Sequence, residues 1–213
     1  MISLILVMAG SGTRMNRGIN KVLLPLGNKK IYEYSIEKFQ KLGFEIICVI
    51  NPLDDIEKKD GIIYVNGGKT RGESVYNGLL KANNDYVFIH DAARPLLSED
   101  VIKNILNILN KEEAYLVYKD SIDTLKYVED NNLKTLDRNK IIRAETPQCA
   151  PKKILIDAYE KAFKENSSYT DDISLLEIYH PEVKINLIKG NLENFKITLD
   201  FDYMVAKKLV END

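Results

Sequence analysis

The chain has few of the residues that build disulfides, metal centres and nucleophilic triads. Its 213 residues include two cysteines, two histidines and no tryptophan. Cys48 lies inside a hydrophobic run, and Cys149 follows about a hundred positions later without any C-x-x-C spacing. We therefore expect buried free thiols rather than a disulfide or a metal site. His90 and His180 are too few for a histidine-rich zinc site or an easily recognised catalytic triad.

The sequence also lacks an excess of positive charge and a long hydrophobic run. Thirty lysine and arginine residues face 32 acidic residues, giving a formal net charge of −2, so no global field attracts nucleic acid and any anion site must be local. The apolar run at residues 1–9 has no basic flank before it and is too short for a signal peptide or a membrane span. We expect a cytoplasmic protein that binds neither nucleic acid nor membrane.

What the sequence does have is an alternation of strand and helix patterns. Hydrophobic residues make up 45% and charged residues 29%, which is typical of a chain that forms a core. Helices are predicted after Arg71 and after a cap at Ser98. Short apolar runs predict buried strands at residues 2–8, 45–50, 61–65, 85–90, 114–119 and 183–188. This alternation predicts an α/β fold with a doubly wound, mostly parallel, Rossmann-like sheet.

Residues 120–143 interrupt the alternation with a polar segment. Within it, residues 124–128 alternate in polarity and residues 129–132 are turn-like, which predicts a protruding β-hairpin arm. A hairpin with so few apolar residues is not stable alone, so it either lies on the main domain or pairs with a second chain. We predict one domain over residues 1–213 with 120–143 as an inserted arm.

Three further helices are predicted in the C-terminal part of the chain. Pro151 is expected in the first turn of one helix, and Thr170 is expected to cap the next. A last helix is predicted over residues 200–210.

The first strand leads into a loop with the sequence Ala9-Gly-Ser-Gly-Thr-Arg-Met15. In an open α/β sheet, ligands bind beyond the carboxyl ends of the strands. The loop is neither a P-loop nor a complete dinucleotide fingerprint, and its glycines alone favour a plain tight turn. However, Arg14 and Lys21 place a cation at each end of it, which suits a triphosphate whose charge must be neutralised during attack at phosphorus.

Further motifs follow in order along the chain. They are Gly67-Gly68 with Arg71 and Ser74, His90-Asp-Ala-Ala-Arg-Pro95, Asp123-Thr124, Asp137-Arg-Asn139, Thr146-Pro-Gln148 and Asn194-Phe-Lys-Ile-Thr198. Together with the first loop and Lys21, these motifs resemble those of the 2-C-methyl-D-erythritol 4-phosphate cytidylyltransferases over essentially the whole chain. The resemblance implies a nucleotidyltransferase that transfers CMP from CTP to 2-C-methyl-D-erythritol 4-phosphate, giving 4-diphosphocytidyl-2-C-methyl-D-erythritol and pyrophosphate in isoprenoid precursor biosynthesis. It also implies a divalent cation, usually Mg²⁺, and a homodimer formed through the arm.

The resemblance also implies roles for individual residues. As catalytic groups, Arg14 and Lys21 would stabilise charge on the CTP phosphates, while Arg138 and Lys196 would align the sugar phosphate. Asp91 is the candidate metal ligand. The implied nucleotide-binding residues are Ala9, Gly10, Ser11, Gly12, Thr13, Gly67, Gly68, Ser74, Asp91 and Ala92. The implied substrate-binding residues are Arg94, Thr124, Arg138, Thr146 and Lys196, with Arg138 entering the partner's pocket from the arm.

Some positions depart from the pattern or allow two interpretations. Asn20 stands where these enzymes usually have a proline before the lysine, so the backbone is less restricted there. Ser121 offers the same hydroxyl as Thr124, although the D-T-x-K pattern is better met at Thr124. We expect His90 to orient the Asp91 loop by hydrogen bonding rather than to act as a general base, because a phosphate dianion needs no proton removed.

Two other functions stay open at this level. One is the related ribitol 5-phosphate cytidylyltransferase, although Ala93 and Asp137-Arg-Asn139 favour the methylerythritol substrate. The other is a noncatalytic nucleotide-sensing module. Retention of both Arg14 and Lys21 favours catalysis, since sensing needs affinity without selectivity for a transition state.

Overall fold

A seven-stranded sheet forms the centre of the protein in the computed structural model, which describes residues 1–10 and 19–211. Its strands are β1 (Ser3–Val7), β4 (Glu45–Ile50), β5 (Ile62–Asn66), β6 (Tyr86–Asp91), β7 (Ala114–Asp120), β10 (Ile142–Pro151) and β11 (Ile185–Lys189), in the spatial order β11-β7-β10-β6-β1-β4-β5. Within the described residues, β10 alone runs antiparallel to its neighbours. The prediction of a mostly parallel α/β sheet is therefore confirmed.

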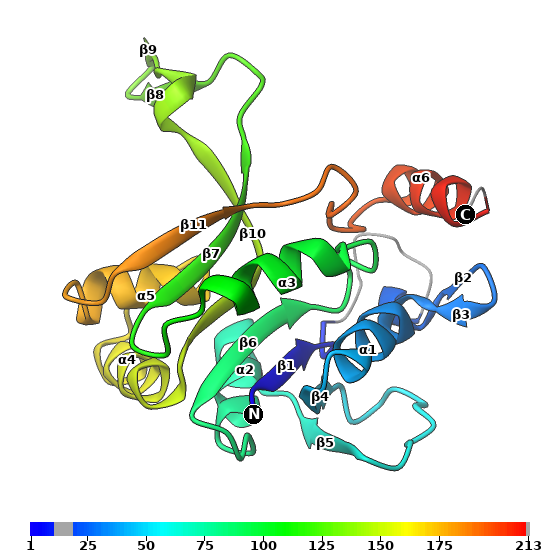
Figure 1. Ribbon diagram of the computed structural model, residues 1–213. Coiled ribbons are helices and arrows are strands. Elements are labelled where there is room, and N and C mark those ends of the chain that lie inside the picture. The colour runs from blue at the N-terminus through cyan, green and yellow to red at the C-terminus, as the bar shows by residue number, and fades with distance from the viewer. Residues whose placement is uncertain (11–18, 212–213) are drawn as a thin grey trace.

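Helices cover both faces of the sheet (Figure 1). The helices α1 (Ile31–Lys41) and α3 (Glu99–Ile108) pack on one face, and α2 (Arg71–Leu79), α4 (Lys152–Glu165) and α5 (Asp172–Tyr179) pack on the other. Side chains alternate along a strand, so Leu4 and Leu6 join the first core cluster while Ile5 joins the second. Burial on both faces explains why the parallel strands read as continuous apolar runs.

A third, smaller cluster attaches the C-terminal helix. The helix α6 (Asp200–Val210) packs through Tyr203 and Ala206 against Leu26. Leu26 belongs to a small ribbon of β2 (Pro25–Leu26) and β3 (Lys29–Lys30), which follows the 3₁₀ helix η2 (Lys21–Leu23). The segment that carries Lys196 is thereby held near the start of the chain.

The carboxyl ends of β1, β5 and β6 meet at one edge of the sheet because these strands, together with β4, run in the same direction. Residues 8–10, 67–68 and 92–94 follow these ends. An added Cβ at Gly67 would overlap the Cβ of Ala9, so glycine is required for the two loops to approach this closely.

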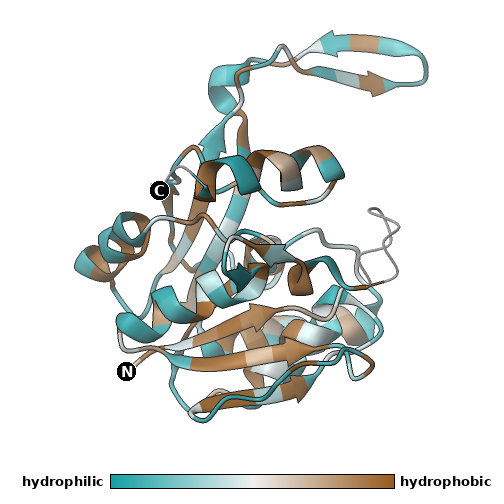
Figure 2. Cartoon of the chain, turned by 90° about the vertical axis from the view of Figure 1, so that its right-hand side faces the viewer, coloured by the Kyte–Doolittle hydropathy of each residue, from teal (hydrophilic) through white to brown (hydrophobic). Residues whose placement is uncertain are grey.

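The hairpin predicted within residues 120–143 is present and projects away from the main body (Figure 1). It consists of β8 (Lys126–Glu129) and β9 (Asn132–Thr135), and the 3₁₀ helix η3 (Arg138–Lys140) connects it to β10. Asp130 and Asn131 have positive φ values of 46° and 64°, as a two-residue type I′ hairpin turn requires. Figure 2 shows hydrophobic and hydrophilic residues mixed along the arm, in contrast to the hydrophobic strands of the sheet.

Some of the predicted element boundaries and helix caps are confirmed, and others are wrong. The strand at 45–50, the helix at 200–210 and the Ser98 cap are confirmed, since Ser98 Oγ accepts a hydrogen bond from the Val101 amide. The Thr170 cap is wrong, because the Asp171 side chain caps α5 by accepting from the Ser174 amide. Pro151 ends β10 and is the N-cap of α4 rather than a residue of its first turn. Residues 124 and 125 precede the first hairpin strand.

Both cysteines are free and buried, as expected. Burial raises the pKa of the Cys48 thiol to about 12, so the free thiol is protonated at neutral pH. Within residues 1–10 and 19–211, no helix combines the length and hydropathy needed to cross a bilayer.

Candidate active site

A cavity of about 430 Å³ opens where the carboxyl ends of β1, β5 and β6 meet. Its wall carries four cationic side chains, those of Lys21, Lys69, Arg71 and Lys196, whereas Asp91 is the one carboxylate among the described residues that line it. The whole chain has a net charge of −2, so this concentration of positive charge is local. Such a wall suits a polyanionic ligand. The residues predicted from sequence that line the cavity are Ala9, Gly10, Lys21, Gly68, Ser74, Asp91 and Lys196.

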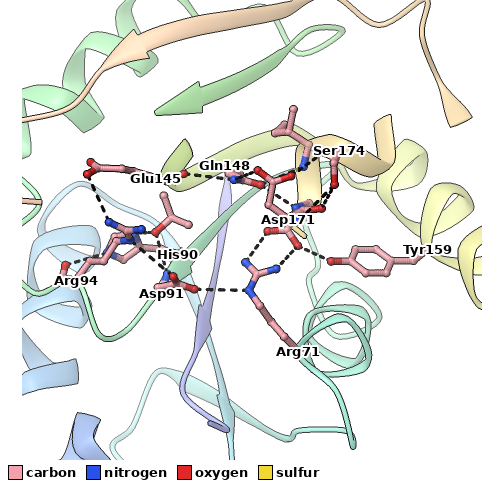
Figure 3. A network of polar contacts seen from close by, with 12 residues as sticks. Arg71, His90, Asp91, Arg94, Glu145, Gln148, Tyr159, Asp171 and Ser174 are labelled. Carbon is pink, nitrogen blue, oxygen red and sulfur yellow. Dashed lines mark hydrogen bonds and ion pairs between the residues drawn. The ribbon is translucent and has the colours of Figure 1, made fainter. Parts of the chain in front are cut away.

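Asp91, at the end of β6, is surrounded by cations. Its carboxylate lies 2.8 Å from Lys196 Nζ and 3.7 Å from the Nε atoms of both Arg71 and Arg94 (Figure 3 shows the two arginines). Burial alone would raise the pKa of the Asp91 carboxyl, but Lys196, Arg71 and Arg94 outweigh it and hold the pKa well below its usual range. Asp91 is therefore ionised at neutral pH.

His90 and Thr146 fix the backbone around Asp91. The Thr146 hydroxyl lies 2.9 Å from His90 Nδ1 and accepts a hydrogen bond of 3.1 Å from the Asp91 amide. His90 Nε2 lies 3.2 Å from the Arg94 carbonyl, which can only accept, so Nε2 carries the proton and Thr146 donates to Nδ1. Burial lowers the pKa of His90 to about 3, in agreement with a neutral ring. The expected orienting role of His90 matches this geometry.

Arg71 is held by a buried acidic residue from α5. Its two terminal nitrogens donate to the Asp172 carboxylate at 2.9 and 2.7 Å, and the Tyr159 hydroxyl donates to the same carboxylate (Figure 3). Gln148 of β10 holds the start of α5, because its side-chain oxygen accepts from the Asp172 and Ile173 amides at 2.9 and 3.0 Å. Arg71 is thus oriented between Asp172 and Asp91 at the cavity wall.

Arg94 connects Asp91 to the segment before Lys196. Its Nη1 donates to the Asn194 carbonyl at 2.7 Å and lies 3.6 Å from a Glu145 carboxylate oxygen. The Asn194 amide group donates to Glu145 at 2.9 Å and to the Thr146 carbonyl at 3.0 Å. These bonds join the two segments that flank Asp91 into one rigid wall.

Gly67 and Ala92 lie beside the cavity rather than on its surface, whereas Ser74 lines it and also fixes a neighbouring turn. Ser74 Oγ accepts from the Gly68 amide at 3.1 Å and donates to the Thr70 carbonyl at 2.8 Å, so it fixes the Gly67-Gly68 turn. Gly67 lies behind Gly68, where it packs on Ala9. Ala92 is buried and donates to the Val7 carbonyl, while its neighbour Ala93 lines the cavity.

The two predicted residues of the arm do not line the cavity of their own chain. Thr124 and Arg138 are exposed, and Arg138 Nη1 donates to the Ile122 carbonyl at 2.8 Å within the arm. Ser121 is buried. The remaining predicted residues, Ser11, Gly12, Thr13 and Arg14, lie outside the described residues.

Sequence reasoning missed several groups that shape the site. Asp172, Glu145 and Asn20 were given no role in the site, although each is buried and bonded to a residue of the cavity or its wall. In the sequence, the sign that Asp172 is buried is its place next to a hydrophobic run that begins with Ile173. That pattern does not reveal its partner Arg71, which is 101 positions away.

Comparisons with known proteins agree with this geometry. A family model described as IspD, 2-C-methyl-D-erythritol 4-phosphate cytidylyltransferase, matches residues 2–212. The relative of that name from Clostridioides difficile is 36% identical over 224 aligned residues, covering 99% of this chain and 94% of the relative.

Solved structures give the same result. The 4-diphosphocytidyl-2C-methyl-D-erythritol synthase of Anaerococcus prevotii superposes with a TM-score of 0.88 at 29% identity, covering 99% of this chain and 96% of that one. The Francisella tularensis 2-C-methyl-D-erythritol 4-phosphate cytidylyltransferase superposes with a TM-score of 0.81 at 30% identity, covering 97% and 98%.

Proposed function

Because the chain belongs to the 2-C-methyl-D-erythritol 4-phosphate cytidylyltransferase (IspD) family, we propose that the cationic cavity is the place where it binds CTP and where the α-phosphorus is attacked. The enzyme transfers CMP from CTP to 2-C-methyl-D-erythritol 4-phosphate, and this is a step of isoprenoid precursor biosynthesis. The products are 4-diphosphocytidyl-2-C-methyl-D-erythritol and pyrophosphate.

The observation that carries this proposal is the charge of the cavity wall. Four cationic side chains face a space of about 430 Å³ at the sheet edge where nucleotides bind in open α/β folds. Charge grows on the phosphorus and the leaving group during in-line attack, and fixed cations stabilise that charge more strongly than mobile water does. We assign this role to Lys21, together with Arg14, and the glycine turn at Gly68 to contact with the nucleoside.

The acceptor phosphate is assigned to the other end of the cavity. Lys196 lines the cavity beside Asp91. Arg94 does not line it, but lies 3.7 Å from Asp91 and donates to the Asn194 carbonyl. Two polyanions repel each other, so cations between them lower the cost of bringing them together. In this arrangement Lys196 holds the sugar phosphate for attack, while Thr146 acts on it through the position of Asp91.

The described residues offer few ligands for a divalent cation. They contain no group of three histidine, cysteine or acidic side chains that would hold a metal by itself, and Asp91 is the one carboxylate at the cavity among them. Mg²⁺ in nucleotide sites is commonly held by one or two carboxylates together with substrate phosphates. Asp91 would then be the protein ligand of Mg²⁺, which neutralises phosphate charge when bound.

We assign the arm to contact with a second subunit. Its exposed apolar side chains, which a monomer would leave in water, include Ile122, Tyr127, Val128 and Leu133. Arg138 is exposed at the base of the hairpin and does not line the cavity of its own chain. A homodimer that covers the apolar residues and delivers Arg138 and Thr124 to the partner's cavity accounts for both facts. The cytoplasmic location expected from the sequence stays a prediction.

The assignment is tested by pyrophosphate release from CTP with three acceptor conditions. We expect release with 2-C-methyl-D-erythritol 4-phosphate and almost none with ribitol 5-phosphate or without a polyol phosphate. Preference for ribitol 5-phosphate would identify the chain as a ribitol 5-phosphate cytidylyltransferase instead. CTP binding without pyrophosphate release under any condition would support a nucleotide sensor instead.

A further inference from the structure

Asn20, directly before Lys21, is a buried polar side chain with three hydrogen bonds. Its Nδ2 donates to the Met8 carbonyl at 2.6 Å and to the Asp54 carboxylate at 2.7 Å, and its Oδ1 accepts from the Val22 amide at 3.3 Å. The residue is 5% exposed. All the hydrogen-bonding capacity of the amide nitrogen is therefore used within the protein.

These bonds join three parts of the chain. Met8 follows β1, Asp54 lies in the loop after β4, and Asn20 is the N-cap of η2, whose first residue is Lys21. The backbone on the other side of Lys21 is also fixed, since the Leu23 amide donates to the Asn20 carbonyl and the Leu24 amide to the Lys21 carbonyl. The Cα of Lys21 is thus held against the carboxyl end of the first strand.

The backbone of Asn20 has the conformation that proline imposes. Its φ and ψ are −62° and 124°, and proline fixes φ near −65°. A proline would restrict this backbone covalently, whereas asparagine restricts it through side-chain bonds to Met8 and Asp54. The expectation of a less restricted backbone at this position therefore overlooked a second means of fixing it.

We propose that Asn20 and Asp54 form a clamp that positions Lys21 at the phosphate wall. The inference rests on the proposed role of Lys21. Asp54 does not line the cavity, and among the described residues its carboxylate accepts a hydrogen bond from Asn20. A substitution at Asp54 therefore distinguishes a positioning role of Asn20 from a direct contact between Asn20 and CTP.

The test compares kcat and the KM for CTP among matched variants. A misplacement of a catalytic group by about 1 Å can cost about 100-fold in rate. We therefore expect Asn20→Ala and Asp54→Ala to lower kcat by at least about tenfold, with a smaller change in KM. The double variant should be no worse than Asn20→Ala alone, because both changes open one clamp. Asp55→Ala, an exposed carboxylate of the same loop, should retain wild-type values.

Asn20→Pro is the decisive variant, because it removes the side-chain bonds and preserves the backbone angle. We expect its kcat to exceed that of Asn20→Ala by at least about fivefold if the backbone position of Lys21 is what matters. A proline variant as slow as the alanine variant, or an Asp54→Ala variant with wild-type kcat, would overturn the clamp.

Lys21→Ala serves as the reference that keeps the two hypotheses apart. If it retains wild-type turnover, the proposed role of Lys21 fails. If it is inactive while Asn20→Ala is within twofold of wild type, only the clamp fails. Thermal unfolding of every variant shows whether a loss of kcat comes from loss of the fold, and Asp54→Ala, at a half-buried loop position, tests the clamp without emptying a buried site.

Discussion

Arg71 and Asp172 form a two-pronged hydrogen-bonded ion pair across 101 positions of sequence, with bonds of 2.9 and 2.7 Å. The two side chains differ in burial, since Arg71 is 32% exposed and Asp172 is 1% exposed. Arg71 also lines the cavity, so a structural ion pair in the α2–α5 contact orients a cation of the candidate active site. The asymmetry in burial leads to a prediction about stability.

Arg71→Met should destabilise the fold more than Asp172→Asn does. Removing the arginine leaves a buried carboxylate without its charged partner, which costs about 3–5 kcal/mol. Replacing Asp172 by asparagine leaves a guanidinium that water reaches, so about 1–3 kcal/mol is expected. Urea unfolding at pH 7 measures both values, and the opposite order would show that Asp172 is not held mainly by Arg71.

Lys21→Ala and Arg14→Ala should each reduce turnover by about 100- to 1,000-fold at saturating CTP, by analogy with the loss of one oxyanion donor. The reason is that, in the proposed mechanism, each cation stabilises charge that grows only in the transition state. Lys58→Ala, an exposed lysine away from the cavity, is the control. A wild-type kcat in either variant would show that the substituted residue has no part in the mechanism.

Lys196→Met should affect the acceptor more than the nucleotide. Lys196 lies 2.8 Å from Asp91 and is assigned to the sugar phosphate, so its loss should raise the KM for 2-C-methyl-D-erythritol 4-phosphate by about tenfold or more, the value of one charge-assisted hydrogen bond. The KM for CTP should change by less, and Lys196→Arg should recover part of the loss. Equal increases in both KM values would place Lys196 at the nucleotide instead.

Acidification should destabilise the protein through His90. Folding lowers its pKa from 6.5 to about 3, so between these pH values the unfolded chain binds a proton that the folded chain does not. The contribution of His90 is complete above about pH 6.5 and is lost as the pH falls, by about 2 kcal/mol at pH 5. Asp91, Arg94 and Lys38 also face the ring.

The variant His90→Gln isolates that contribution, because it leaves the neighbouring charged groups in place. The slope of unfolding free energy against pH between 6.5 and 4 should be smaller in His90→Gln than in the wild type. Identical slopes would show that His90 is protonated in the folded protein or that its ring is not buried in solution.

The sequence was sufficient where local chemistry decides the structure. The strand at 45–50 has an unbroken apolar pattern, and Ser98 has the hydroxyl and spacing of a helix cap, so both were predicted correctly. The strand β10 was not predicted, because it contains Pro147, its first residues are partly exposed, and its register shifts between Ala144 and Gln148. Tertiary pairing with β6 and β7 outweighs these local signals.

In the candidate site, too, the sequence points to groups that are close together along the chain but not to groups that only the fold brings together. The prediction of a phosphate loop after β1 relies on glycines and cations that lie close together in the sequence, within residues 9–21. The partners of Asp91 come from positions 71, 94 and 196, and only the topology of the sheet brings them together. The Asp171 cap was assigned to Thr170 because both side chains can accept from a helix N-terminus, and backbone geometry decides between them.

If the arm completes the partner's active site as proposed, two inactive variants should restore activity when mixed. Lys21→Ala leaves the arm intact, and Arg138→Ala leaves the cavity intact, so a mixed dimer contains one complete site, formed by the cavity of the second variant and the arm of the first. After random exchange of subunits, about half of the dimers are mixed, and each mixed dimer has one complete site out of two. About a quarter of wild-type activity should therefore return. Each variant assayed alone should be nearly inactive.

Mixing Lys21→Ala with Lys140→Ala is the matched control, since Lys140 is an exposed cation in the same 3₁₀ helix as Arg138 and has no assigned role. Lys140→Ala should be active by itself, and mixing should give only the average of the two preparations. If the Lys21→Ala and Arg138→Ala mixture stays inactive although size-exclusion chromatography shows exchanged dimers, Arg138 does not serve the partner's cavity. If the wild type elutes as a monomer and is active, the arm has another function. Restored activity requires both that the chain dimerises and that Arg138 crosses to the other subunit, because exchange between two sites that were each complete within one subunit would restore nothing.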